Sequence, residues 1–103
     1  MNNFVQQGDV IFEIVENVKG TQIEHDGVIA EGEATGHSHR IEHHELGKVK
    51  FFRNEGTMYL DILGNVQVEH QEHKKINLPK GKYRVHRVKE FDHFLEERRN
   101  VQD

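Results

Sequence analysis

The stretch that decides the fold runs from Lys48 to His70 and reads KVKFFRNEGTMYLDILGNVQVEH. It contains three apolar and aromatic runs of a composition that favours strands. The first two runs are separated by Asn54-Glu55-Gly56, and the second and third by Gly64-Asn65. Glycine and asparagine accept the backbone conformations of tight turns. The stretch therefore predicts a hairpin followed by a short turn into a third strand.

The same alternation of apolar runs and turn residues continues on both sides of this stretch. The expected strands are Val10–Val18, Val28–Ala30, His37–Ile41, Lys48–Arg53, Thr57–Leu63, Val66–His70, Lys74–Leu78 and Lys82–Lys89. Turn signals at intervals of about 8–12 residues are typical of all-β domains. We expect a small antiparallel β-barrel or sandwich over residues 1–90. Helical spacing of Phe91, Phe94 and Leu95 predicts a short C-terminal helix or tail over residues 91–103.

Composition narrows the functional classes. The net charge is -4, so a nucleic-acid partner is not expected, because such proteins usually carry a basic face. There is no cysteine, so a metal ligand would have to be imidazole or carboxylate. The N-terminus lacks the pattern of a signal peptide, and no apolar run approaches the length of a membrane span. We therefore expect a soluble cytoplasmic protein.

The low hydrophobic fraction of the chain, 34%, is relevant to whether it forms an oligomer. A chain of 103 residues with so few apolar side chains has a small core of its own. Phe51 and Phe52 are neighbours, so in a strand only one of them faces the core. The other phenylalanine would need a second layer, a helix or a neighbouring subunit. This pattern favours a homodimer.

Histidine is the unusual residue, with nine in the chain. Residues two apart in a strand share a face, so His37 and His39 lie on the same side as Ile41. His70 likewise continues the face of Val66 and Val68. His73 can join His70 if the chain bends after the strand. Imidazole nitrogen is a good ligand for zinc, iron, nickel or manganese. We expect His37, His39, His70 and His73 to bind one divalent metal ion.

Two carboxylates are candidate catalytic groups beside such an ion. Glu33 precedes the first histidine pair, and Glu72 lies between His70 and His73. A glutamate next to metal-bound water can act as a general base. Because Glu72 lies between the two histidines of its pair, it could instead point away from them. His86 or Glu33 could also replace one of the four histidine ligands.

Two resemblances involve the histidine pairs, and only the first of them implies a metal site. Gly32 followed by His37-Ser38-His39 resembles the first motif of the cupins, small β-barrels in which a His-x-His pair, a glutamate and a later histidine bind a metal. The spacing from Gly32 to His37 is one residue shorter than in that motif. The chain also resembles a family of small uncharacterised bacterial and phage proteins. This second match is carried by Gln7-Gly8-Asp9-Val10, by residues 32–41, by His70-Gln71-Glu72-His73 and by residues 78–85.

Three functional hypotheses remain open from the sequence. The first is a small metal-binding protein with a place for a small ligand, which could be a metalloenzyme. The second is a metal-free hydrolase or nuclease that uses paired histidines as acid and base, since their pKa values lie near neutrality. The third is a phage or bacterial interaction protein whose histidines are structural.

Overall fold

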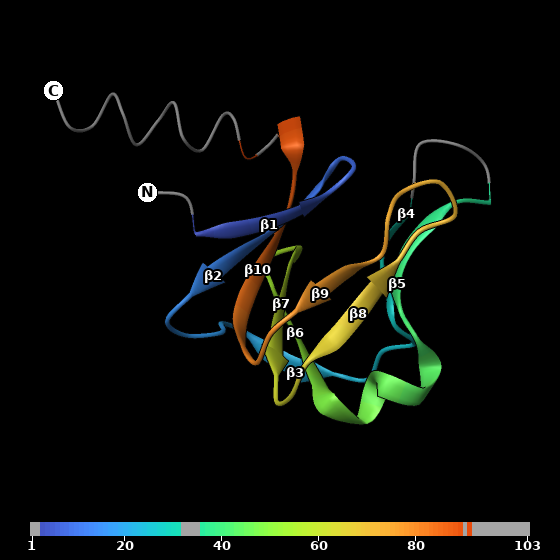
Figure 1. Cartoon of the computed structure of the whole chain (residues 1–103). Coiled ribbons are helices and arrows are strands. Elements are labelled where there is room, and N and C mark those ends of the chain that lie inside the picture. The colour runs from blue at the N-terminus through green and yellow to red at the C-terminus, as the bar shows by residue number, and fades with distance from the viewer. Residues whose placement is uncertain (1–2, 32–35, 90, 92–103) are drawn as a thin grey trace, which may run out of the picture.

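The computed structural model describes residues 3–31, 36–89 and 91. Its larger sheet consists, in spatial order, of β1 (Phe4–Gln7), β2 (Val10–Val15), β10 (Gly81–Arg87), β7 (Thr57–Ile62), β6 (Val49–Asn54) and β3 (Thr21–Ile23). Its smaller sheet consists of β4 (Val28–Glu31), β5 (Ser38–Ile41), β8 (Val66–Glu69) and β9 (Ile76–Leu78). Every pair of neighbouring strands is antiparallel. Figure 1 shows the two sheets and their connections.

The hairpin that decides the fold forms as its turn residues predict. β6 and β7 pair from Val49 with Ile62 to Asn54 with Thr57, which leaves two residues in the turn. Those residues, Glu55 and Gly56, both have positive φ angles, of 49° and 81°. Two successive positive φ angles match the right-handed twist of a two-residue hairpin. The Asn-Glu-Gly sequence therefore fixes the register of the two central strands.

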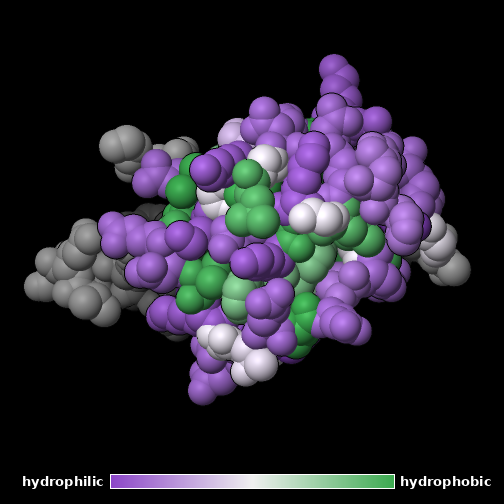
Figure 2. Space-filling model, turned by 90° about the horizontal axis from the view of Figure 1, so that it is seen from below, coloured by the Kyte–Doolittle hydropathy of each residue, from purple (hydrophilic) through white to green (hydrophobic). Residues whose placement is uncertain are grey.

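One hydrophobic core joins the two sheets. The larger sheet contributes Phe12, Leu60 and Tyr83, and the smaller sheet contributes Ile41 and Val68, all of them fully or almost fully buried. Phe51 is buried at 4% exposure and its neighbour Phe52 is only partly buried, as strand parity predicts. Hydrophilic residues form most of the face seen from below, with hydrophobic side chains visible near its centre (Figure 2).

The antiparallel all-β prediction is confirmed, and the structure narrows the choice of architecture. The strand orders are those of two open sheets, so the described strands form no closed barrel. The structure adds two strands that the sequence pattern did not predict, β1 and β3. The strand expected over Val10–Val18 ends at Val15. Between β5 and β6 the chain forms the 3-10 helix η1 (His43–Lys48).

The predicted C-terminal helix lies mostly outside the described residues, which leave out 90 and 92–103. Phe91 is described and is buried at 5% exposure. Its ring centre lies 5.2 Å from that of Phe4 and 4.9 Å from that of His86. Among the described residues, no helix is long and apolar enough to cross a membrane.

Candidate functional site

Four histidines gather where β5 begins and β8 ends. His39 lies in β5, His37 precedes it, His70 follows β8, and His73 lies in the loop to β9. The ring centres of His39 and His70 are 4.4 Å apart, and those of His70 and His73 are 4.5 Å apart. The ring of His37 lies 5.5 Å from that of His70. We call these four residues the histidine cluster.

Strand pairing explains why the two halves of the cluster meet. β5 and β8 are neighbours, with Arg40 opposite Glu69 and Ile41 opposite Val68. His39 and His70 therefore come next in the same antiparallel register. The β1–β2 turn lies at the same end of the molecule as the loop after β8 (Figure 1). That turn brings Gln7 and Asp9 against His39.

A buried hydrogen-bond network sets the protonation of His39, which is fully buried. The Nε2 atom of Gln7 donates to the carbonyl oxygens of Val68 and Lys74, each at 2.9 Å. Gln7 Oε1 is then an acceptor, and it lies 2.8 Å from His39 Nδ1. His39 Nδ1 must therefore carry a proton. In the neutral ring the lone pair is on Nε2.

That Nε2 atom faces a carboxylate. Asp9 Oδ1 lies 3.2 Å from His39 Nε2, while Asp9 Oδ2 accepts a 2.6 Å hydrogen bond from Arg87. Burial acts to raise the pKa of Asp9, but the hydrogen bond and charge of Arg87, together with the contact to His39, lower the pKa below its ordinary value. Asp9 is therefore ionised at neutral pH. Two acceptor atoms at this distance need a cation, either a proton or a metal ion, to relieve their repulsion.

Two rings of the cluster favour the neutral form. Burial lowers the pKa of His39 below its ordinary value, although the hydrogen bond to Asp9 opposes the shift. Burial also lowers the pKa of His70, helped by the neighbouring His73 and His37. His70 Nδ1 accepts a 3.1 Å hydrogen bond from the backbone N–H of Glu72, so the proton of neutral His70 lies on Nε2. Neutral imidazole is the form that binds metal ions.

The loop after β8 is attached to the start of β5. Gln71 Oε1 accepts a hydrogen bond from the backbone N–H of Ser38, and Gln71 Nε2 donates to the carbonyl oxygen of Gly36. Glu72 Oε1 lies 2.9 Å from His37 Nδ1. Glu72, one of the two predicted catalytic carboxylates, thus pairs with a histidine of the other segment. Glu33 lies outside the described residues.

His73 depends on a glycine in the β1–β2 turn. Gly8 has a φ of 57°, and a Cβ atom added to it would lie 2.5 Å from His73 Nε2. The absence of a side chain at Gly8 therefore lets the exposed His73 pack against the turn that carries Asp9. This contact adds a third segment to the cluster.

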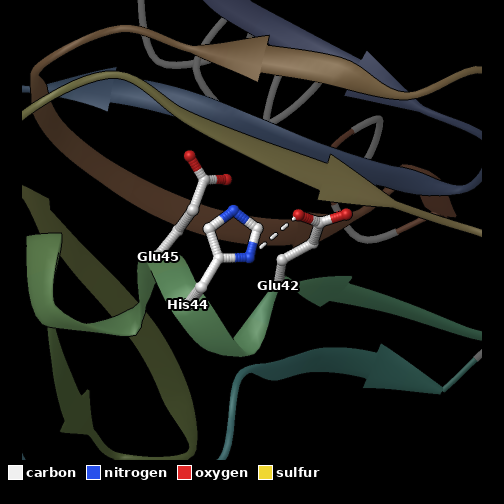
Figure 3. A group of neighbouring side chains, drawn as sticks. All are labelled: Glu42, His44 and Glu45. Carbon is white, nitrogen blue, oxygen red and sulfur yellow. Dashed lines mark ion pairs between the residues drawn. The ribbon is translucent and has the colours of Figure 1, made fainter.

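The ligand atoms of the histidine cluster do not converge on one point. Within the described parts of the chain, the group of three whose ligand atoms lie within 4.8 Å of one another is Glu42, His44 and Glu45 (Figure 3). Glu42 lies at ion-pair distance from His44, at 3.2 Å, and from Lys75, at 3.6 Å. Glu45 accepts a hydrogen bond from the backbone N–H of Gln67. Both carboxylates thus already have positively charged or donor partners.

The reserve ligand predicted from the sequence lies elsewhere. His86 is buried in β10, with its Nε2 atom 2.7 Å from Glu13 Oε1, and it packs on Phe91. The sequence reasoning missed Gln7, Asp9 and Arg87. A recognisable signal existed for the first two, since Gln7-Gly8-Asp9 is a polar segment with a central glycine, which is typical of a turn.

Comparisons with known proteins give a family and no activity. No curated protein and no solved structure matches the chain. A family model described as a domain of unknown function (DUF8820) matches residues 6–88, a range that contains the whole histidine cluster together with Gln7, Asp9 and Arg87, and the chain therefore belongs to that family.

Proposed function

We propose that this protein binds one divalent transition metal ion at the histidine cluster, with Asp9 as an additional ligand. The observation that carries the proposal is the contact of His39 Nε2 with Asp9 Oδ1 at 3.2 Å, with His39 Nδ1 fixed as a donor by Gln7. Two ligand atoms that each lie about 2.0–2.2 Å from one ion, at the tetrahedral angle, are about 3.3–3.6 Å apart. At 3.2 Å the pair is slightly closer than this, so a small movement apart would admit an ion between the two atoms.

The surroundings of this pair suit a metal centre. Gln7 acts as the outer partner that holds the ring of a metal-binding histidine in one tautomer. His70 and His73 lie beside His39, and they would supply a third and a fourth ligand once their rings turn and His70 Nδ1 releases its hydrogen bond from Glu72. Nitrogen and carboxylate ligands suit zinc, iron, nickel or manganese. With fewer than four protein ligands, one position would remain for water or a small ligand, as in catalytic zinc sites.

Metal titration of the untagged protein tests the proposal. Protein purified without a nickel column and stripped with a chelator should bind one equivalent of zinc, iron(II), nickel or manganese by calorimetry. His39→Gln and Asp9→Asn should each lower the affinity at least about tenfold. His44→Gln is the matched control, because it removes the exposed histidine of the Glu42 group and should change nothing. If His44→Gln abolished metal binding while His39→Gln retained it, the metal site would lie at the Glu42 group and the proposal would be refuted.

A glycine pair gives a second arm to this experiment. Gly8→Ala introduces a Cβ atom into the position of His73, whereas a Cβ atom added to Gly56, at φ 81°, would meet nothing within 4 Å. Both substitutions carry a backbone cost of about 1–2 kcal/mol for an L-residue at positive φ. Gly8→Ala alone should weaken metal binding. Equal affinities of the two variants would remove His73 from the site.

A second candidate function is acid–base catalysis without metal. It is favoured by the 2.9 Å contact between His37 Nδ1 and Glu72 Oε1, because a carboxylate that orients an imidazole leaves the other ring nitrogen to move protons. Hydrolysis of p-nitrophenyl acetate in the presence of chelator, lost in His37→Gln, would support it. Absence of chelator-resistant hydrolysis would exclude this reaction.

A further inference from the structure

A second region of interest lies where two strands of the larger sheet separate. β10 and β7 pair from Gly81 with Ile62 to Arg84 with Tyr59. Beyond this point the last residues of β10, Val85–Arg87, and the first residues of β7, Thr57 and Met58, line a pocket of about 250 Å³. β4 supplies part of the opposite wall, through Ile29 and Ala30. The pocket therefore lies where the hydrogen-bonded pairing of β10 with β7 ends.

The charge of this pocket is opposite to that of the chain. Its wall includes Arg53, Arg87, His25 and His86, and none of its lining residues is acidic. The chain as a whole has a net charge of -4, so the excess of basic side chains is a property of this pocket and not of the overall composition. Two of the basic groups have acidic partners outside the wall, namely Asp9 for Arg87 and Glu13 for His86. Within the described residues, Arg53 has no carboxylate at ion-pair distance.

The polar groups of the wall are mainly hydrogen-bond donors. His25 Nδ1 accepts a 3.0 Å hydrogen bond from the backbone N–H of Gly27, so the proton of the neutral ring is on Nε2. Burial lowers the pKa of His25, and its ring stacks on Phe51 at 4.5 Å between centres. Arg53 has five N–H groups in a fixed fork that fits an oxyanion. The remaining wall is apolar at Ile29, Met58 and Val85.

We infer that this pocket binds a small oxyanion, a molecule with a carboxylate or phosphate group and a short apolar part. The guanidinium of Arg53 would bind the anionic group at the exposed rim, with the His25 ring beside it. The apolar wall would contact the rest of the ligand. A volume of about 250 Å³ is just below the range of about 300–1,000 Å³ for small-molecule pockets, so the ligand is small. The inference does not depend on metal binding.

Titrations followed by amide NMR test the inference on chelator-treated protein, so that metal has no part in the result. Inorganic phosphate and butyrate are the two probes, at constant ionic strength set with chloride. Either probe should shift the amide signals of Ala30, Gly56 and Thr57 in a saturable way. A response to phosphate alone or to butyrate alone supports the pocket and identifies the oxyanion. A lack of saturable shifts at these amides with both probes would overturn the inference.

Substitution of the rim arginine sharpens this test. Arg53 is exposed, so the Arg53→Gln variant should fold normally. It should lower the affinity for the probe at least about tenfold, which is the effect of losing one hydrogen bond to a charged group. Arg53→Lys keeps the charge but loses the fork and should give an intermediate affinity. Lys50→Gln is the matched control, since Lys50 is exposed on the same strand and does not line the pocket. Equal weakening by Lys50→Gln and Arg53→Gln would show general charge screening and would refute the site.

Discussion

Gln7 is the residue on which the local chemistry depends. It is 2% exposed, and its three side-chain hydrogen bonds reach β8, the loop before β9 and the ring of His39. Both amide hydrogens are used by carbonyl oxygens, which leaves the amide oxygen to accept from His39. One buried glutamine therefore joins two sheets and also selects which nitrogen of His39 is free. A purely structural glutamine would need only the first of these roles.

Replacement of Gln7 by Met should lower the free energy of unfolding by about 2–4 kcal/mol, because it leaves two carbonyl oxygens and the His39 N–H without their partner in a buried place. Urea denaturation of the metal-free protein measures this change. Gln6→Met is the control, since Gln6 is exposed and makes one hydrogen bond, to the carbonyl oxygen of Gly8. It should cost less than about 0.5 kcal/mol. Similar losses in both variants would contradict the network.

At the scale of elements, the site is a junction of three segments. β5 and β8 supply His39 and His70 through their register, and the β1–β2 turn supplies Asp9. The loop after β8 is held to β5 by Gln71, whose amide makes two hydrogen bonds to the backbone around His37. Both bonds are exposed, so they contribute more to the position of the loop than to the stability of the fold.

Gln71→Ala should therefore separate binding from stability. We expect a loss of at most about 1 kcal/mol in the free energy of unfolding, together with an approximately tenfold loss of metal affinity, because the loop that carries His70 and His73 is no longer attached to β5. Calorimetry and denaturation of the same preparation give both numbers. Gln67→Ala, an exposed position on β8, should change neither. A large loss of stability with unchanged metal affinity would assign Gln71 to the fold alone.

The elements also show what the sequence could and could not predict. Strand parity correctly places Ile41, Val66 and Val68 in the core, because period-two alternation depends only on local geometry. β1 and β3 were missed because they are short strands at the edges of the sheet, with few buried residues to give a pattern. Asp9 and Arg87 were missed because the contacts of Asp9 with His39 and with Arg87 depend on the order of strands, which no local spacing encodes.

At the scale of the whole molecule, Arg87 links the two proposed sites. It lines the oxyanion pocket, donates to Asp9 at 2.6 Å and donates to the carbonyl oxygen of Glu31 at 2.7 Å. A metal ion at Asp9 would compete with this guanidinium for the same carboxylate. Occupation of either proposed site would therefore change the charge that the other experiences, which is the condition for coupling between two ligands.

The same arrangement makes stability depend on pH. Burial lowers the pKa values of His25, His39 and His70 from their ordinary value of 6.5. Between that value and the lower folded values, the unfolded chain binds more protons than the folded chain, so stability rises with pH. This contribution to stability is therefore fully present above about pH 7.5, and it is lost as the pH falls from 6.5 through the lower pKa values of the folded state. Asp9 and Glu69, whose pKa values are also lowered, extend the loss below about pH 4.5, because they must be protonated as acid unfolds the chain.

Urea denaturation of metal-free protein at about pH 7.5, 6.5 and 5.5 measures this dependence. The free energy of unfolding should fall at each step. His39→Gln should flatten the profile, because its buried ring no longer resists protonation. His43→Gln alters an exposed residue of η1 and should leave the profile unchanged. A free energy of unfolding that rises on acidification from about pH 7.5 to 5.5 would mean that the cluster binds protons in the folded state, and His39 would then form a protonated pair with Asp9 in place of a metal site.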